Sequence, residues 1–327
     1  MKTADYQYPI EQCDVPPERR SALESYRAKR RTWLAWLDTD EHHAIWTAIS
    51  AMVWTDVSFR ALSQFAIDDE ASCLGNSLLA EQLINGHVAT QVLAIRRLVD
   101  KRTDVISLRR LIKEIRRNLG SFTRENYVCH DGLPYDYEAV QIKEMMARAG
   151  SGPFWGTTSG PNAYGASQMA HYQFDSLTGI DPAKRTREDC LPSALLDTIG
   201  GWLDNSGADE LTDWSHAYLA HAGDPMNRQR VNAFKVTNNK ITEAIKTLAR
   251  VTEAISAYIL YAGSRLNSLM PTAQFDQFEN LEKPILRDDA KDDAYQFWTR
   301  LTEERDSFLE GVDSELIGSA TPEKLRP

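Results

Sequence analysis

The stretch Asn238–Tyr261, NNKITEAIKTLARVTEAISAYILY, gives the clearest indication of the fold. Large apolar side chains recur in it at steps of three, four or seven residues, which places them on one face of an α-helix. They are Ile241, Ile245, Leu248, Ile255 and Ile259. Thr237 or Asn238 can cap the start of this helix through its side-chain oxygen.

Helical periodicity also dominates the rest of the chain. It predicts helices over residues 17–37, 41–65, 77–99, 107–119, 137–149, 166–177, 191–203, 209–222 and 288–310. No stretch shows the alternation typical of a β-strand, and no internal repeat is evident. Long helices joined in places by short turns favour an all-α helical bundle.

The helix predicted over 41–65 carries an apolar stripe of Ile45, Ile49, Val53 and Val57. This stripe is wide because tryptophans flank it, so we expect the helix to be well buried.

Composition shifts suggest three regions. Residues 1–40 form an N-terminal helix and arm, and residues 41–265 form a helical core into which a loop-rich region at about 120–190 is inserted. Residues 266–327 form an acidic C-terminal helix and tail. The inserted region includes Gly150–Gly165, which is rich in Gly, Ser and Pro and carries aromatic residues. It lacks the Gly-Lys-Ser/Thr of a phosphate-binding loop.

Composition also excludes several classes of protein. None of the 327 residues belongs to an apolar run of 18, so no transmembrane helix is expected. The N-terminus has no apolar signal segment. Cys13, Cys73, Cys129 and Cys190 lie far apart and form no CxxC pair, which is typical of reduced thiols. We therefore expect a cytoplasmic protein.

Charge is uneven along this chain, whose net charge is −10. Nine basic residues face three acids between Arg96 and Arg117, whereas thirteen acids face five bases between Asp276 and Glu315. The basic stretch has two interpretations: it pairs with acidic residues of the tail or of a second subunit, or it binds phosphate groups. The candidate phosphate ligands are Arg96, Arg97, Arg109 and Arg110.

Residue spacing also indicates two local side-chain pairs. Arg96 and Arg97 lie four and three residues before Asp100, a spacing typical of an ion pair on a helix surface. Cys129 and His130 are neighbours in an irregular stretch, where a thiolate–imidazole pair is an alternative to two structural residues.

The segment Trp214–Pro225, WSHAYLAHAGDP, combines His216, His221 and Asp224 near a predicted helix end. A cation is favoured there by the helix dipole, so His221 is a candidate general acid/base, or else a cap for the last carbonyl groups. His216 and His221 are five residues apart, about 140° around a helix, and do not form a metal pair. We expect no metal and no cofactor.

Five segments carry a family resemblance. QVLAIRRLVD at 91–100, followed by ISLRRLI at 106–112, resembles the helical core of HEPN-like proteins of the bacterial abortive-infection type. AHAGD at 220–224 looks like the later motif of that group, in which a histidine closes a helix. RENYVCHDGLPY at 124–135 and PTAQFDQFE at 271–279 look like parts of an uncharacterised bacterial family, and the resemblance spans about residues 40–285.

The resemblance implies a four-helix core, a homodimer, and a role in phage defence or a toxin–antitoxin system. Active members carry Arg, four to six residues, then His. His221 matches the histidine, but Trp214, Ser215 and His216 occupy the positions where the arginine would fall. We therefore expect a non-catalytic interaction protein that binds a protein partner, a nucleotide or RNA phosphate. The alternative is a metal-independent endoribonuclease in which His221 is the general acid/base and a protonated His216 supplies a charge.

Overall fold

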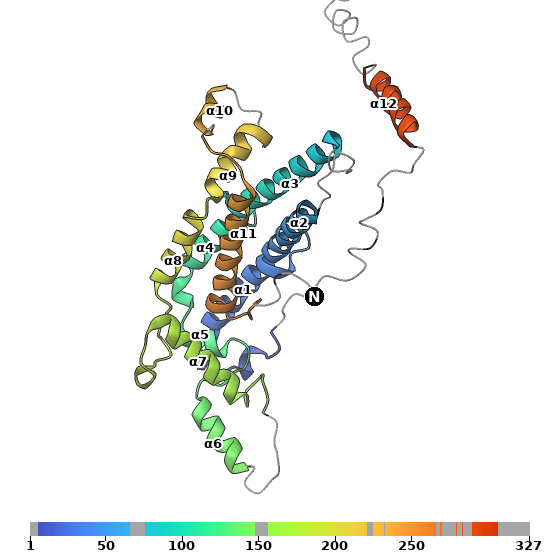
Figure 1. The fold of residues 1–327 in the computed structure, drawn as a ribbon. Coiled ribbons are helices and arrows are strands. Elements are labelled where there is room, and N and C mark those ends of the chain that lie inside the picture. The colour runs from blue at the N-terminus through green and yellow to red at the C-terminus, as the bar shows by residue number, and fades with distance from the viewer. Residues whose placement is uncertain are drawn as a thin grey trace, which may run out of the picture. The chain divides into compact units, whose positions relative to one another are not determined.

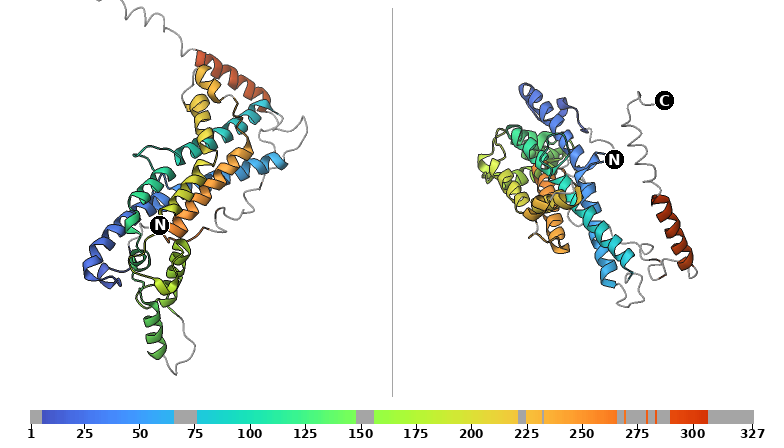
Figure 2. Two further views of the ribbon diagram at one scale, coloured as in Figure 1. Left: turned by 90° about the vertical axis from the view of Figure 1, so that its left-hand side faces the viewer. Right: turned by 90° about the horizontal axis from the view of Figure 1, so that it is seen from above.

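A computed structural model describes residues 6–65, 76–147, 156–220, 225–231, 233–265, 269, 279, 283 and 290–306. The chain divides into two compact units (Figures 1 and 2). The first comprises Met1–Ile67 and Ser77–Pro271, and the second comprises Asp68–Asn76 and Thr272–Pro327. Each unit is considered by itself.

The regular secondary structure of the described residues is helical, which confirms the all-α class. In the first unit the α-helices are α1 (Arg20–Leu34), α2 (Ile45–Phe65), α3 (Ser77–Leu98), α4 (Leu108–Arg117), α5 (Arg124–Cys129), α6 (Tyr137–Ala147), α7 (Tyr164–Thr178), α8 (Ser193–Asp204), α9 (Ala208–Ser215), α10 (Pro225–Val231) and α11 (Asn238–Glu253). Within the described ranges there is no β-strand, and an isolated bridge joins Thr123 to Cys190.

Three helices end in a π-helical turn: η3 (Ala35–Thr39) follows α1, η7 (His216–Ala220) follows α9, and η8 (Ala254–Ile259) follows α11. Periodicity predicted each of these as the end of one continuous helix. A π turn contains an extra residue per turn, which alters the face on which the following side chains lie.

Helices α2, α3 and α11 lie side by side at the centre of the first unit (Figure 1). Ile45 and Ile49 of α2, Ile95 of α3, and Ile241 and Leu248 of α11 are all fully buried between them. Thr237 caps α11 by accepting a hydrogen bond from the Lys240 amide. The predicted apolar face of the Asn238–Tyr261 stretch is therefore the centre of the core.

The prediction that α2 is well buried holds for its first half and not for its second. Ile45 and Ile49 are fully buried, whereas Val57 is 40% exposed and Leu62 is 38% exposed. On α3, Ile84 is likewise 51% exposed. Apolar side chains are buried only where a neighbouring helix covers them. The apolar pattern of α2 does not indicate how far the neighbouring helices extend.

An N-terminal arm, residues 6–15, packs against the loop that follows α5. The Tyr8 amide donates to the Asp131 carboxylate at 3.0 Å, and Asp14 accepts from the Tyr135 amide at 2.8 Å. Gly132 lies directly on the Tyr8 ring with a φ of +82°, and a Cβ there would come within 2.6 Å of a ring carbon. Only glycine satisfies both the left-handed backbone and this close approach.

The second unit contains one described helix, α12 (Ala290–Asp306). Asp292 and Asp293 lie in its first turn, where the helix dipole favours acids. Across all described residues, no helix combines the length and the apolar character needed to cross a membrane.

A buried ion network anchors α5 to α7. Arg124, which is fully buried, donates to Asp189 at 2.8 Å and to Asp175 at 2.7 Å, and its guanidinium lies over the Phe174 ring. Arg185 also pairs with Asp175. Removing one member of such a network leaves a charge buried without its partner.

We therefore expect Arg124→Leu to lower the free energy of unfolding by about 3–5 kcal/mol. Arg117→Leu is the matched control, because Arg117 pairs with Glu114 on the surface and its loss should cost less than about 1 kcal/mol. Urea unfolding measures both values, and equal losses would refute a structural role for the network.

Candidate functional site

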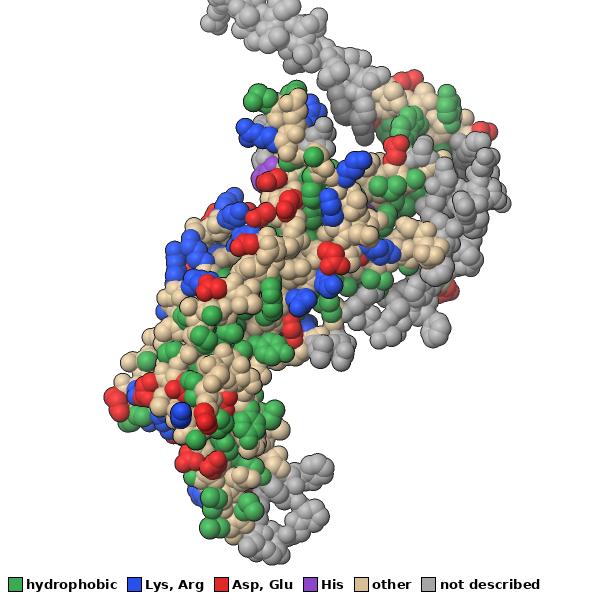
Figure 3. All heavy atoms as spheres, turned by 60° about the vertical axis from the view of Figure 1, so that its left-hand side comes forward, with side chains coloured by type: hydrophobic (Ala, Val, Ile, Leu, Met, Phe, Trp, Pro, Cys, Tyr) green, Lys and Arg blue, Asp and Glu red, His purple; other side chains and the backbone are tan. Residues whose placement is uncertain are grey.

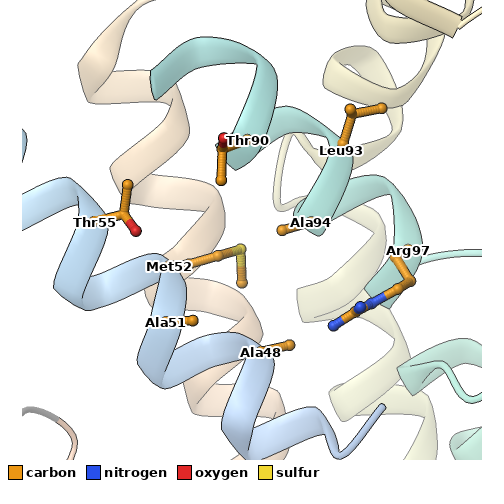
Figure 4. Close-up of a pocket in the computed structure, with 8 residues that line it drawn as sticks. All are labelled: Ala48, Ala51, Met52, Thr55, Thr90, Leu93, Ala94 and Arg97. Atoms are coloured by element: carbon orange, nitrogen blue, oxygen red, sulfur yellow. The ribbon is translucent and has the colours of Figure 1, made fainter. Parts of the chain in front are cut away.

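A groove runs between α2 and α3 on the side away from α11 (Figure 4). We call it the α2–α3 groove, and its volume is about 420 Å³. Its lining residues are Ala48, Ala51, Met52 and Thr55 of α2 and Thr90, Leu93, Ala94 and Arg97 of α3.

Small side chains create this groove. Ala48, Ala51 and Thr55 follow one another at helical spacing on α2, opposite Thr90 and Ala94 on α3. Short side chains on both helices leave a depression between the backbones, and Met52 forms its floor (Figure 4). The lined stretch of each helix is about 10 Å long, since each residue adds about 1.5 Å.

One exposed leucine lines the depression, and another lies further along α2. Leu93, which lines the groove, is 42% exposed, and Leu62 lies seven residues beyond Thr55 on the same face of α2. On α3, a Cβ added to Gly86 would meet nothing within 4 Å, so the surface beyond Thr90 is open. Exposed leucines beside small residues are typical of a surface that another helix covers.

Among the described residues, Arg97 is the only charged one that lines the groove. It lies in the last turn of α3, and in Figure 4 its guanidinium reaches from α3 toward α2. The Arg97 side chain is exposed and makes no hydrogen bond or ion pair with the residues that the structure describes. The expected pair with Asp100 does not form, because Asp100 instead accepts from the Arg102 amide and its carbonyl accepts from Ser107.

The other arginines of the basic stretch are differently placed. Arg109 donates to Asp204 at 2.7 Å and to Asp209 at 2.9 Å, and Arg116 donates to Asp197 at 2.6 Å. Figure 3 shows basic and acidic side chains side by side over this face. The acidic partners lie on α8 and α9.

Arg110 is occupied in another way. It donates to the Val105 carbonyl at 3.1 Å, and its guanidinium lies 4.3 Å from the centre of the Trp36 ring. Arg96 is half-buried on α3 and has no ion pair within the described ranges. The structure thus separates the four predicted phosphate ligands: Arg97 borders a groove, whereas Arg109 and Arg110 hold α4 against neighbouring segments.

The predicted histidine site is described only in part. His216 is half-buried in the π turn η7, near the stacked rings of Trp214 and Tyr218. His221 and Asp224 lie outside the described residues. Among the described residues, no group of three or more His, Cys, Asp or Glu side chains could hold a metal ion.

The neighbours Cys129 and His130 have no exposed reactive group. Burial raises the pKa of the Cys129 thiol well above its usual value and lowers the pKa of His130 well below its usual value. His130 Nδ1 lies 2.9 Å from the Tyr127 carbonyl oxygen, and Tyr6 of the arm lies over the ring edge. These residues belong to the core.

Unlike the His221 segment, another segment contains both residues of the Arg, four to six residues, His spacing that the resemblance implies. Arg124 and His130 are separated by five residues. Arg124 is fully buried and paired with two carboxylates, and His130 is 7% exposed. Neither side chain can reach a dissolved substrate in this structure.

Comparison with known proteins found no matching family model, no matching curated protein and no matching solved structure. The assignment of a site therefore depends on the geometry of this chain. The α2–α3 groove is the described feature that combines an open apolar surface with a charge that has no partner.

Buried histidines predict how stability depends on pH. Burial lowers the pKa of His171 from 6.5 to about 4, and it lowers the pKa of His87 and His130 as well. The unfolded chain therefore binds protons near pH 6.5 that the folded chain excludes. Consequently, the free energy of unfolding should fall as the pH drops from 6.5 toward 4.

Urea unfolding at several pH values measures this dependence. We expect His171→Gln to reduce the slope by up to about 1.4 kcal/mol per pH unit. His42→Gln is the control, because His42 is exposed and should not alter the slope. If the free energy of unfolding of His171→Gln depends on pH as steeply as that of the unaltered chain, the lowered pKa of His171 does not contribute to stability.

Proposed function

We propose that this chain is a non-catalytic helical interaction protein of HEPN-like type. Its α2–α3 groove binds an amphipathic helix whose apolar side chains fill the depression and whose carboxylate pairs with Arg97. The observation that carries the proposal is an open, two-turn groove of small residues that ends at an arginine with no ion pair to any residue that the structure describes.

Helix packing favours this occupant. Small residues allow a third helix to approach α2 and α3 closely, and exposed Leu62 and Leu93 provide apolar contacts at its borders. About two turns of a partner helix match the lined length. Leucine, alanine or valine side chains at i, i+3, i+4 and i+7 would therefore occupy the groove.

Charge selects the partner further. The two acids of α2 and α3 are Asp56, which is buried, and Glu81, which does not line the groove. A second copy that presented the same face would bring Arg97 no carboxylate, so we favour a different helix that carries Asp or Glu. The homodimer implied by the resemblance would then use another surface, which sedimentation analysis of the full chain tests separately.

Three labelled amphipathic helical peptides test the groove. They share one apolar face and differ only in a single Glu, Gln or Lys placed to meet Arg97. We expect the full chain to bind them in the order Glu, Gln, Lys, with a difference of about three- to tenfold between Glu and Gln. In Arg97→Glu the order should reverse, because the charge that selects the peptide is reversed. Fluorescence anisotropy measures the affinities.

Two variants serve as controls. Lys113→Glu changes an exposed charge on α4 and should preserve the order of affinities. Ala51→Trp fills the groove at an exposed position and should weaken all three peptides while leaving unfolding unchanged. Peptide affinities that change in neither Arg97→Glu nor Ala51→Trp would refute the groove as the binding site. Binding of RNA, but of no peptide, in an Arg97-dependent manner would make Arg97 a phosphate ligand instead.

A non-catalytic protein should not cut RNA. We expect the purified full chain to leave single-stranded RNA intact, and His221→Ala to behave identically. Cleavage by the unaltered chain that disappears in His221→Ala would establish the ribonuclease alternative. Gel analysis of an end-labelled RNA gives the result.

A further inference from the structure

A polar cluster lies between α2 and α3 at the base of the groove. Asp56 is 6% exposed, His87 is 5% exposed and Gln91 is fully buried. Within the described residues, Asp56 Oδ1, Gln91 Oε1 and both ring nitrogens of His87 have no hydrogen-bond partner. Unpaired polar atoms in a helix interface are costly, so this cluster is a weak point of the packing.

The two oxygens of Asp56 differ in their surroundings. Asp56 Oδ2 accepts from Arg60 Nε at 2.9 Å and from the Thr242 hydroxyl of α11 at 3.1 Å. Asp56 Oδ1 faces His87 Nε2 at 3.8 Å, beyond a hydrogen bond. Phe59 stacks on the other side of the imidazole, with ring centres 4.0 Å apart. Asp56 is thus hydrogen-bonded to α11 through Oδ2, whereas its Oδ1 makes no hydrogen bond to α3.

The cluster is directly connected to the groove. Gln91 Nε2 donates to the Met52 carbonyl at 2.9 Å, and the Met52 side chain forms the floor of the groove. Thr55 and Thr90, which line the groove, immediately precede Asp56 and Gln91. A change in the spacing of α2 and α3 at the cluster therefore changes the width of the groove.

A proton on His87 would act on this spacing. Burial lowers the pKa of His87, Arg60 lowers it further, and Asp56 raises it. These two charges are on α2. Helices α9 and α11 also pack on α3, but among their described residues no charged group shifts His87, and α11 contributes the neutral Thr242. The protonated ring is thus more stable where water reaches it, so a proton favours a separated α2–α3 pair.

We infer that protonation of His87 separates α2 from α3 and so releases a helix bound in the groove. The release rests on the proposed function, whereas the separation of the two helices does not. Since a single proton is involved, the population of the separated state can rise at most tenfold for each unit by which the pH falls.

Amide hydrogen exchange of the full chain without peptide tests the separation. Rates are compared at about pH 7.5 and pH 5.5 after correction for intrinsic exchange. We expect protection of residues 52–60 and 84–94 to fall several-fold at the lower pH in the unaltered chain, and to stay constant in His87→Gln. His171→Gln, which removes a buried histidine between α7 and the Tyr135 loop, should retain the change. An equal loss of protection in His87→Gln would overturn the inference.

Asp56→Asn provides a second variant should His87→Gln not fold. Because Asp56 raises the pKa of His87, its loss should move the midpoint of the exchange change to lower pH. A midpoint that stays in place would also overturn the inference.

Peptide affinity separates the two proposals. Weakening of the Glu peptide at about pH 5.5 that disappears in His87→Gln supports both. His87-dependent exchange without peptide binding supports the separation and refutes the docking function. If the peptide binds, but neither amide exchange nor peptide affinity changes in His87→Gln, the pH-dependent separation is refuted and the docking function is not.

Discussion

One hydrogen bond and one ring stack define the relation of α2 to α3, and the groove depends on that relation. The Gln91 amide donates to the Met52 carbonyl, and Phe59 stacks on His87 four residues earlier along α3. Together they fix the register of two antiparallel helices. That register brings the small residues of both helices opposite one another on the outer side, while Ile49 and Ile95 pack against α11 on the inner side.

The placement of arginines follows from the same helical frame. Arg109 and Arg116 meet acids of α8 and α9, and Arg124 meets Asp175 and Asp189, so these guanidinium groups hold helices together. Arg97 differs because no acid among the described residues pairs with its side chain. A charge that makes no structural pair is free to select a ligand, and its position at the end of an apolar groove suits a ligand that is itself amphipathic.

The fold class and most helix positions could be predicted from the sequence, because the apolar side chains of Asn238–Tyr261 repeat with helical spacing and Thr237 is a cap. The π turns could not, since a single wider turn leaves no periodic signal. The partners of Arg109 lie about 100 residues away on α8 and α9. Local charge counting could not identify them, and it left pairing with the acidic tail or a second subunit and phosphate binding as the two interpretations. The sequence does contain an indication of the groove, because Ala48, Ala51 and Thr55 place small residues beside the apolar stripe of α2. Whether such a face is covered depends on tertiary packing, which spacing does not reveal.

The polar cluster explains why the packing of α2 on α3 can change with pH. Leucines in place of Asp56, His87 and Gln91 would remove four unpaired polar atoms and would be expected to strengthen the interface. Across this cluster, α2 is joined to α3 by the Gln91 hydrogen bond and by the Phe59–His87 stack, whereas Arg60 joins α2 to the start of α11 through the Asn238 carbonyl. The distal half of the pair adds little, since Val57, Leu62 and Ile84 are exposed. A change at His87 therefore acts where the exposed half of the helix pair begins, and its effect falls on the neighbouring segment that forms the groove.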